Sequence, residues 1–286
     1  MYKALSPHAI QVRPANLQEA LAYARMGGFA GLEFNPGEVA DLVEAHGAEH
    51  VRQLFAAAGQ RVAGWGINFD WRGSEAAWQQ GLQQLPRIAQ AAAAIGGTRA
   101  FTWILPSSDE RPYAENWRFH VQRLAPIARV LDAQGCTFGL EFVGPKTMRA
   151  AARYPFIYRM EEMLELGAEL SPRVGLLLDC WHWYTSGGTV AAIRALKPEQ
   201  VVYVHVNDAP RGIAVDAQVD SVRALPGETG VIAIRSFLQA LAAIGYDGPV
   251  VPEPFKKALA DLPSDEARLH VVGAALDANW EAAQLR

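Results

Sequence analysis

Four side chains that can bind metal ions or move protons stand at the ends of apolar segments in this sequence. They are Glu141, Asp179, His205 and Glu253. The segments that lead to them read Thr-Phe-Gly-Leu, Val-Gly-Leu-Leu-Leu, Val-Val-Tyr-Val and Pro-Val-Val-Pro, respectively. Short, nearly continuous apolar runs are typical of parallel strands that are covered on both faces. The sequence therefore predicts four buried strands that each deliver one chemically capable side chain.

Three carboxylates and one imidazole form a mixed oxygen and nitrogen donor set. Such a set suits one divalent metal ion, such as Mn²⁺, Mg²⁺, Co²⁺ or Zn²⁺, and needs no thiolate. A single Glu or His at a strand end is usually an ordinary polar residue that faces a loop. Four of them after buried runs are harder to dismiss, because a buried carboxylate is costly unless it is paired or bound to a metal. We therefore predict that Glu141, Asp179, His205 and Glu253 are metal ligands.

The whole chain alternates predicted strands with predicted helices. The strands cover residues 3–6, 30–34, 61–67, 99–105, 136–143, 174–178, 201–206 and 249–251, and the helices cover 16–26, 48–58, 75–95, 116–133, 156–166, 189–196, 231–244 and 267–283. Eight such units favour an α/β fold with a closed parallel barrel, a (β/α)₈ TIM barrel. In this fold, active sites lie at the carboxyl ends of the strands, where the four ligands are expected. We expect one domain over residues 1–286.

Composition excludes several classes of protein. The 286 residues are 50% hydrophobic and carry a net charge of −4 without a basic block, which argues against a nucleic-acid partner. The two cysteines, Cys136 and Cys180, lie in apolar runs, which indicates a reducing, cytoplasmic compartment. Neither a signal peptide nor a membrane span is expected, because the chain lacks apolar runs of the required kind.

Several motifs resemble the sugar phosphate isomerase/epimerase family, which has a xylose isomerase-like barrel. The motifs are Gly-Leu-Glu141-Phe-Val-Gly, Gly-Leu-Leu-Leu-Asp179-Cys-Trp-His182, Val-His205-Val-Asn-Asp with Arg211, Pro226-Gly227 before Gly230, and Glu253. The resemblance covers essentially the whole chain. Within the family, the sequence most resembles inosose (2-keto-myo-inositol) isomerases, which implies a role in carbohydrate metabolism such as inositol catabolism.

The resemblance implies roles for individual residues. Glu141 and Glu253 match the pair that acts as acid and base while also binding the metal, and Asp179 and His205 match the other two ligands. Two further residues, His182 and Arg211, match positions that contact substrate oxygens. The chain departs from the family in the turn at residues 228–230 and in the two prolines that flank Glu253.

Two tryptophans at predicted strand ends, Trp65 and Trp103, are candidate substrate-binding residues. An indole ring can stack on the C–H face of a polyol and exclude water, although packing in the barrel mouth is an equal alternative for either residue. Together these residues predict a metal-dependent isomerase or epimerase of a keto-polyol or keto-sugar, acting by proton transfer through a cis-enediolate. The sequence leaves open which of the two outcomes occurs and whether the chain forms a homo-oligomer.

Other functions remain as alternatives on the same scaffold. A hydroxypyruvate-type isomerase or a dehydratase uses the same apparatus. An abasic-site endonuclease resembles this barrel but needs further histidine ligands, whereas predicted strands three and four end near Trp65 and Trp103, and the loop 208–230 has no histidine. A non-catalytic binding protein is disfavoured by the intact pair Glu141 and Glu253. The expected partner is therefore a small molecule, with no nucleic acid and no membrane.

Overall fold

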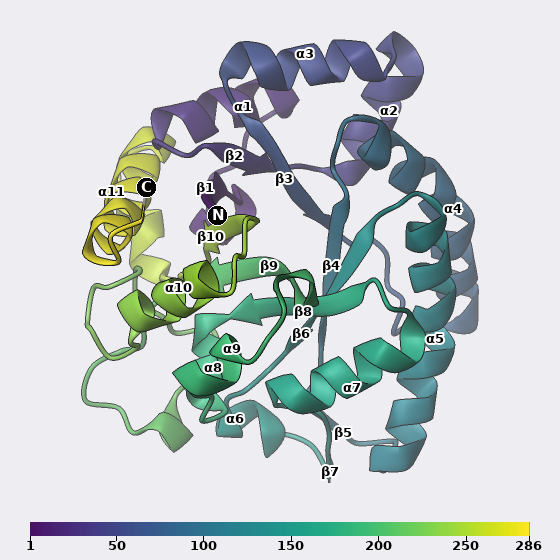
Figure 1. Ribbon diagram of the computed structural model, residues 1–286, viewed down its shortest axis with the longest axis vertical. Helices are drawn as coiled ribbons and strands as arrows, with labels where there is room; N and C mark the ends of the chain where they lie inside the picture. Colours follow the sequence, from purple (N-terminus) through teal and green to yellow (C-terminus); the bar gives the residue numbers. More distant parts are fainter. Residues whose placement is uncertain (286) are drawn as a thin grey trace.

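The computed structural model describes residues 1–285 and shows a closed barrel of eight parallel strands surrounded by helices (Figure 1). Around the barrel the strands follow the order β1-β10-β9-β8-β6-β4-β3-β2. Their bounds are β1 Tyr2–Leu5, β2 Gly31–Glu33, β3 Arg61–Gly66, β4 Arg99–Ile104, β6 Thr137–Phe142, β8 Val174–Asp179, β9 Val201–Val206 and β10 Pro249–Pro252. The predicted TIM barrel is confirmed.

The helices form an outer ring. Their bounds are α1 Leu17–Met26, α2 Pro36–His46, α3 Ala48–Ala58, α4 Glu75–Ala94, α5 Tyr113–Ala133, α6 Lys146–Arg149, α7 Met160–Leu170, α8 Cys180–Thr185, α9 Val190–Arg194, α10 Ile234–Ala243 and α11 Asp265–Ala282. Short 3₁₀ turns (η1 His8–Ile10, η2 Pro198–Gln200, η3 Val215–Ala217, η4 Lys257–Asp261) and a two-stranded ribbon, β5 Ser107–Ser108 with β7 Tyr154–Pro155, lie in the loops. Within residues 1–285, no helix combines the length and apolar character that a membrane span requires.

Two layers of core hold the barrel together. A large cluster fills the space between the strands and the helices, and a smaller one fills the barrel interior. The interior cluster is Tyr2, Ala4, Ala63, Leu177, Tyr203 and Val251, with Phe101 against it. Because side chains alternate along a strand, each strand supplies both layers, which explains the nearly continuous apolar runs in the sequence.

Helix α2 was not predicted, although its sequence contains the signals for it. No helix is predicted between the strand 30–34 and the helix 48–58, yet Asn35 Oδ1 accepts hydrogen bonds from the backbone N–H groups of Gly37 and Glu38. An asparagine cap followed by proline in the first turn is a common helix start. Conversely, Pro86 does not break the predicted long helix, because α4 continues through it.

Candidate metal centre

The barrel brings the four predicted ligand residues together at its mouth. Glu141 lies in β6, Asp179 ends β8, His205 lies in β9 and Glu253 follows β10 directly. Each offers one ligand atom, and these atoms all lie within 4.8 Å of one another. Neighbouring strands hold them in place, since Asp179 and His205 are register partners and the Glu253 N–H bonds the Val206 carbonyl at 3.0 Å.

The unsatisfied atoms of this cluster point to a shared centre. His205 Nδ1 lies 3.4 Å from Glu141 Oε1 and 3.4 Å from Glu253 Oε2. Although the first pair is this close, neither His205 Nδ1 nor Glu141 Oε1 has a hydrogen-bond partner with acceptable geometry, and both atoms are buried. Buried polar atoms are normally satisfied, and exceptions often mark an ion or a catalytic role. The residues present therefore fit a divalent metal ion, which they would hold through three carboxylates and one imidazole.

Asp179 is fixed on both of its oxygens. Oδ1 accepts hydrogen bonds from the Trp181 backbone N–H at 2.8 Å and from Asn207 Nδ2 at 3.0 Å, while Oδ2 accepts one from Arg223 at 2.7 Å. The residue is fully buried. These bonds orient the carboxylate and leave it little freedom, which suits a ligand better than a mobile base.

Arg223, in the long loop between β9 and α10, is a central residue that the sequence interpretation missed. Its guanidinium is buried and also contacts Glu253 Oε2 at 3.1 Å and Asp220 Oδ1 at 2.8 Å. It thus joins two of the four ligand residues. The loop contains two arginines, and a signal for the second is its position directly before the Ala-Leu-Pro226-Gly227 turn, which returns the chain to the barrel mouth.

The electrostatics of the metal-free cluster reflect this crowding of acidic groups. Burial raises the pKa of Glu141, and the neighbouring His205 only partly offsets it. Burial alone would lower the pKa of His205, but Glu253 and Glu141 raise it well above its usual range. For Asp179, burial raises the pKa, yet Arg223 and the two histidines reverse this and hold it below its usual value. In the metal-free protein, a proton on His205 therefore partly substitutes for a cation.

His182 lies beside the cluster. It is buried, and its Nδ1 accepts a hydrogen bond from the Gly144 backbone N–H at 3.2 Å. The proton of the neutral ring is therefore assigned to Nε2, which lies 3.8 Å from Asp179 Oδ2. A side chain at residue 144 would collide with the His182 carbonyl, since its Cβ would lie 2.3 Å away, so only glycine permits this contact.

Arg211, the other predicted oxygen contact, lies apart from this network. It is exposed, and its guanidinium donates a hydrogen bond to the Thr229 carbonyl. Among residues 1–285, none of the four ligand residues forms an ion pair with it. The structure thus gives Arg223, and not Arg211, the position beside the ligands.

The two predicted tryptophans face different surroundings. Trp103 is the register partner of Glu141 and is 44% exposed, so its indole ring lies at the mouth; Arg72 stacks on it at 4.1 Å. Trp65 is completely buried in the layer between strands and helices, and its indole N–H donates a hydrogen bond to the Gly97 carbonyl at 2.9 Å. Packing therefore accounts for Trp65, and we retain only Trp103 as a candidate substrate contact.

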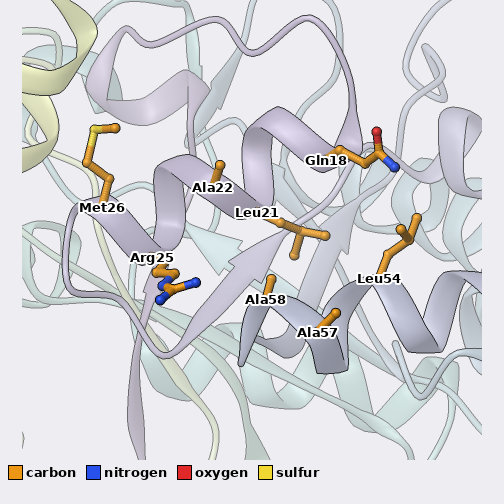
Figure 2. Close-up of a pocket in the computed structure, with 8 residues that line it drawn as sticks. All are labelled: Gln18, Leu21, Ala22, Arg25, Met26, Leu54, Ala57 and Ala58. Carbon is orange, nitrogen blue, oxygen red and sulfur yellow. The ribbon is translucent and has the colours of Figure 1, made fainter.

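A groove also lies away from the strand ends. It measures about 580 Å³ and runs between α1 and α3 on the outer ring of helices. Figure 2 shows Gln18 and Leu21 of α1 opposite Leu54 and Ala57 of α3, with mainly apolar side chains between the helices. The groove contains no acid, histidine or cysteine, so the candidate chemistry stays at the strand ends.

Comparison with known proteins agrees with this fold. An inosose isomerase from Halalkalibacterium halodurans is 21% identical over 263 residues, which cover 91% of this chain and 90% of the relative. A xylose isomerase domain protein from Alicyclobacillus acidocaldarius superposes with a TM-score of 0.86 and 30% identity over 99% of both chains. The IOLI protein, solved with a binding zinc atom, superposes with a TM-score of 0.77 and 16% identity over 99% of this chain and 98% of its own.

The family model for the xylose isomerase-like TIM barrel matches residues 21–274, which is most of the chain and includes all four ligand residues. The chain belongs to the xylose isomerase-like TIM barrel family, as the sequence motifs predicted.

Proposed function

We propose that this protein is a divalent-metal-dependent isomerase or epimerase of a keto-polyol or keto-sugar. The observation that carries the proposal is the position of Glu141 and Glu253, whose carboxylate oxygens each lie 3.4 Å from His205 Nδ1. Neither His205 Nδ1 nor Glu141 Oε1 has a hydrogen-bond partner. The similarity to an inosose isomerase supports the substrate class, and the zinc in a structural neighbour supports the metal.

The ion would be held by Glu141, Asp179, His205 and Glu253. When bound, a divalent cation polarises a carbonyl and its adjacent hydroxyl and so acidifies the C–H bond beside the carbonyl. Asp179 serves as a fixed ligand, because hydrogen bonds already hold both of its oxygens.

The proton transfers belong to Glu141 and Glu253, which reach the centre from different strands of the barrel wall. One carboxylate removes the proton, and the other returns one to the resulting cis-enediolate. Return to the neighbouring carbon gives isomerisation, whereas return to the same carbon from the opposite face gives epimerisation.

Charge on the substrate oxygens is balanced by the Nε2–H of His182, whereas Arg223 balances the carboxylates of Asp179 and Glu253. Both groups lie within 4 Å of Asp179 Oδ2, at 2.7 and 3.8 Å. Preorganised donors in a buried site stabilise developing negative charge more strongly than water does. Arg223 is a positioning residue, because its guanidinium is 1% exposed and already bonds Asp179, Glu253 and Asp220. On the open side, Trp103 presents its indole ring as a platform for the C–H face of the substrate.

Proton exchange from D₂O tests this function without knowledge of the product. Metal-loaded protein is incubated with a panel of ketoses and inososes, and deuterium at the carbon beside the carbonyl is measured by NMR. We expect incorporation that is abolished by a chelator and by Glu141→Gln. The exposed Glu115 gives a matched control, since Glu115→Gln leaves exchange unchanged. Absence of exchange from every ketose and inosose with metal-loaded protein refutes the proposal.

A further inference from the structure

A second cavity at the strand ends lies beside the candidate metal centre. It measures about 500 Å³ and lies over the carboxyl ends of β1, β2 and β3, next to the starts of α1 and α2. We call it the β1–β3 chamber. Its polar lining includes Ser6, His8, Glu33, Glu38 and Asn68. None of these residues has a part in the mechanism above.

Glu33 connects the chamber to the metal centre. Its Oε2 accepts a hydrogen bond from the Tyr203 hydroxyl at 3.0 Å, and its Oε1 accepts one from Ser6 at 3.0 Å. Tyr203 precedes the ligand His205 by two residues, and their rings are 5.6 Å apart. A substrate that extends from the four ligands toward β2 therefore meets the Glu33 carboxylate.

The Glu33 carboxylate is enclosed without a strong cationic partner. Among residues 1–285, no lysine or arginine forms an ion pair with it, and burial is the main influence on its pKa, which is raised. Burying such a group is costly unless its hydrogen-bonding capacity is used. A carboxylate offers about four acceptor positions, and Ser6 and Tyr203 occupy two of them. The remaining positions are available to donors in the chamber, which Glu33 lines.

The chamber is unsuited to a phosphate group, although two helices begin there. Backbone N–H groups at helix starts commonly bind anions. Here the donors are already used: Leu17 N–H bonds Glu38 Oε1 at 2.6 Å, and the N–H groups of Gly37 and Glu38 bond Asn35 Oδ1 at 3.0 and 3.2 Å. The lining contains Arg13, whose side chain is exposed. The carboxylates of Glu33 and Glu38 line the same chamber and would repel a phosphate.

We propose that the β1–β3 chamber holds the part of the substrate that lies away from the reacting carbons, and that this part is neutral and polyhydroxylated. Glu33 is the specificity-determining residue, because it accepts a hydrogen bond from a substrate hydroxyl. This inference rests on the proposed function. It goes further because it specifies an unphosphorylated substrate and names Glu33 as the residue that binds its hydroxyl group.

Substrate length provides the first test. Deuterium exchange is measured with dihydroxyacetone, which is too short to fill the chamber, and with a six-carbon ketose such as D-fructose. Glu33→Gln is expected to lower kcat/KM for the six-carbon ketose roughly 10- to 100-fold, the value of a hydrogen bond to a charged group, while exchange of dihydroxyacetone changes less than about twofold. An equal loss with both compounds assigns Glu33 a structural role and overturns the inference.

A second variant covers the case in which Glu33→Gln does not fold. Asn68 lines the chamber, is exposed, and has no hydrogen bond to another side chain among residues 1–285. Asn68→Trp is expected to fill the chamber and to abolish exchange of the six-carbon ketose while sparing dihydroxyacetone. Retention of six-carbon exchange by this variant contradicts the inference.

Binding separates failure of this inference from failure of the proposed function. Affinities of metal-loaded protein for myo-inositol, which has no carbonyl, and for myo-inositol 1-phosphate are measured by calorimetry. Wild type is expected to bind myo-inositol at least about tenfold more tightly than the phosphate, and Glu33→Gln to lose most of that binding. Tighter binding of the phosphate, or no binding of either compound, overturns the inference whether or not any ketose is enolised.

Discussion

The two sides of the barrel mouth differ in how many ionisable side chains they bring together. Strands β6, β8, β9 and β10 bring three carboxylates and His205 within 4.8 Å, with the buried Arg223 bridging two of them. Strands β1 to β3 contribute one partly buried carboxylate, Glu33, which accepts hydrogen bonds from two neutral hydroxyls. The first side therefore holds several ionisable groups in contact, whereas the second holds a single carboxylate among neutral hydrogen-bond donors.

This difference shows how one barrel can separate reactivity from recognition. Charges in a buried site act strongly on one another, so in the metal-free protein the reactive side needs a compensating cation such as Arg223, which pairs with Asp179 and Glu253. The recognition side needs only acceptors and space for hydroxyl groups. We therefore expect substitutions on the two sides to give different kinds of defect: turnover and metal-dependent stability on one, and choice of substrate on the other.

The largest expected effect is on turnover. Glu141→Gln and Glu253→Gln each remove a proton-transfer group and should lower kcat by about 10²- to 10⁴-fold, the usual contribution of general acid–base catalysis. Deuterium exchange gives the rate, and atomic absorption gives the metal content, so that loss of metal is distinguished from loss of the acid or base. Full turnover by either variant with bound metal removes that carboxylate from the mechanism.

Arg223→Met tests charge compensation on the reactive side. It leaves the buried Asp179 carboxylate and that of Glu253 without their cation, which should cost about 3–5 kcal/mol in the metal-free protein. Urea unfolding with a chelator measures the loss, and adding a divalent metal should recover part of it. The exposed Arg211 supplies the control, since Arg211→Met is expected to stay within about 0.5 kcal/mol. Equal effects of the two variants contradict this assignment.

The two tryptophans give a paired prediction of smaller size. Trp65→Phe removes the buried hydrogen bond to Gly97 and some packing volume, which should cost about 1–3 kcal/mol of unfolding free energy with little change in KM. Trp103→Ala should leave stability nearly unchanged, because the side chain is 44% exposed, and should raise KM several-fold. Calorimetric unfolding and initial rates separate the two results, and the reverse pattern would place Trp65 in contact with substrate.

The smallest effect is the pH dependence of the metal-free protein. The carboxylates hold the folded-state pKa of His205 well above 6.5, so its protonated form stabilises the fold. That contribution is complete below about pH 6.5 and is lost as the pH rises through the raised value. Urea unfolding midpoints in the presence of a chelator should therefore fall as the pH rises above 6.5.

Two further measurements sharpen the pH prediction. His205→Gln should flatten this part of the profile. Added metal should reverse the trend, because metal binding displaces protons from its ligands. A rising midpoint in the chelated wild type contradicts the assigned proton on His205.

The repeating pattern of this chain made the barrel predictable from sequence. The apolar runs before Glu141, Asp179 and His205 correspond to β6, β8 and β9. Helix α2 is absent from the predicted elements although Pro36 favours it, because proline in a first helical turn needs no N–H donor. The boundaries elsewhere shift by one to a few residues, as expected where helix ends depend on tertiary contacts.

The sequence alone determined which residues can bind a metal and that they follow consecutive elements of one barrel, because strand periodicity and donor chemistry are local properties. Only the tertiary structure decided among residues in loops. It placed Arg223 against Asp179 and left Arg211 exposed, and it buried Trp65 while opening Trp103 to the mouth. It also brought Glu33 of β2 to Tyr203 of β9, which are 170 residues apart. Such contacts depend on barrel closure and on the path of a long loop, which no pattern of neighbouring residues encodes.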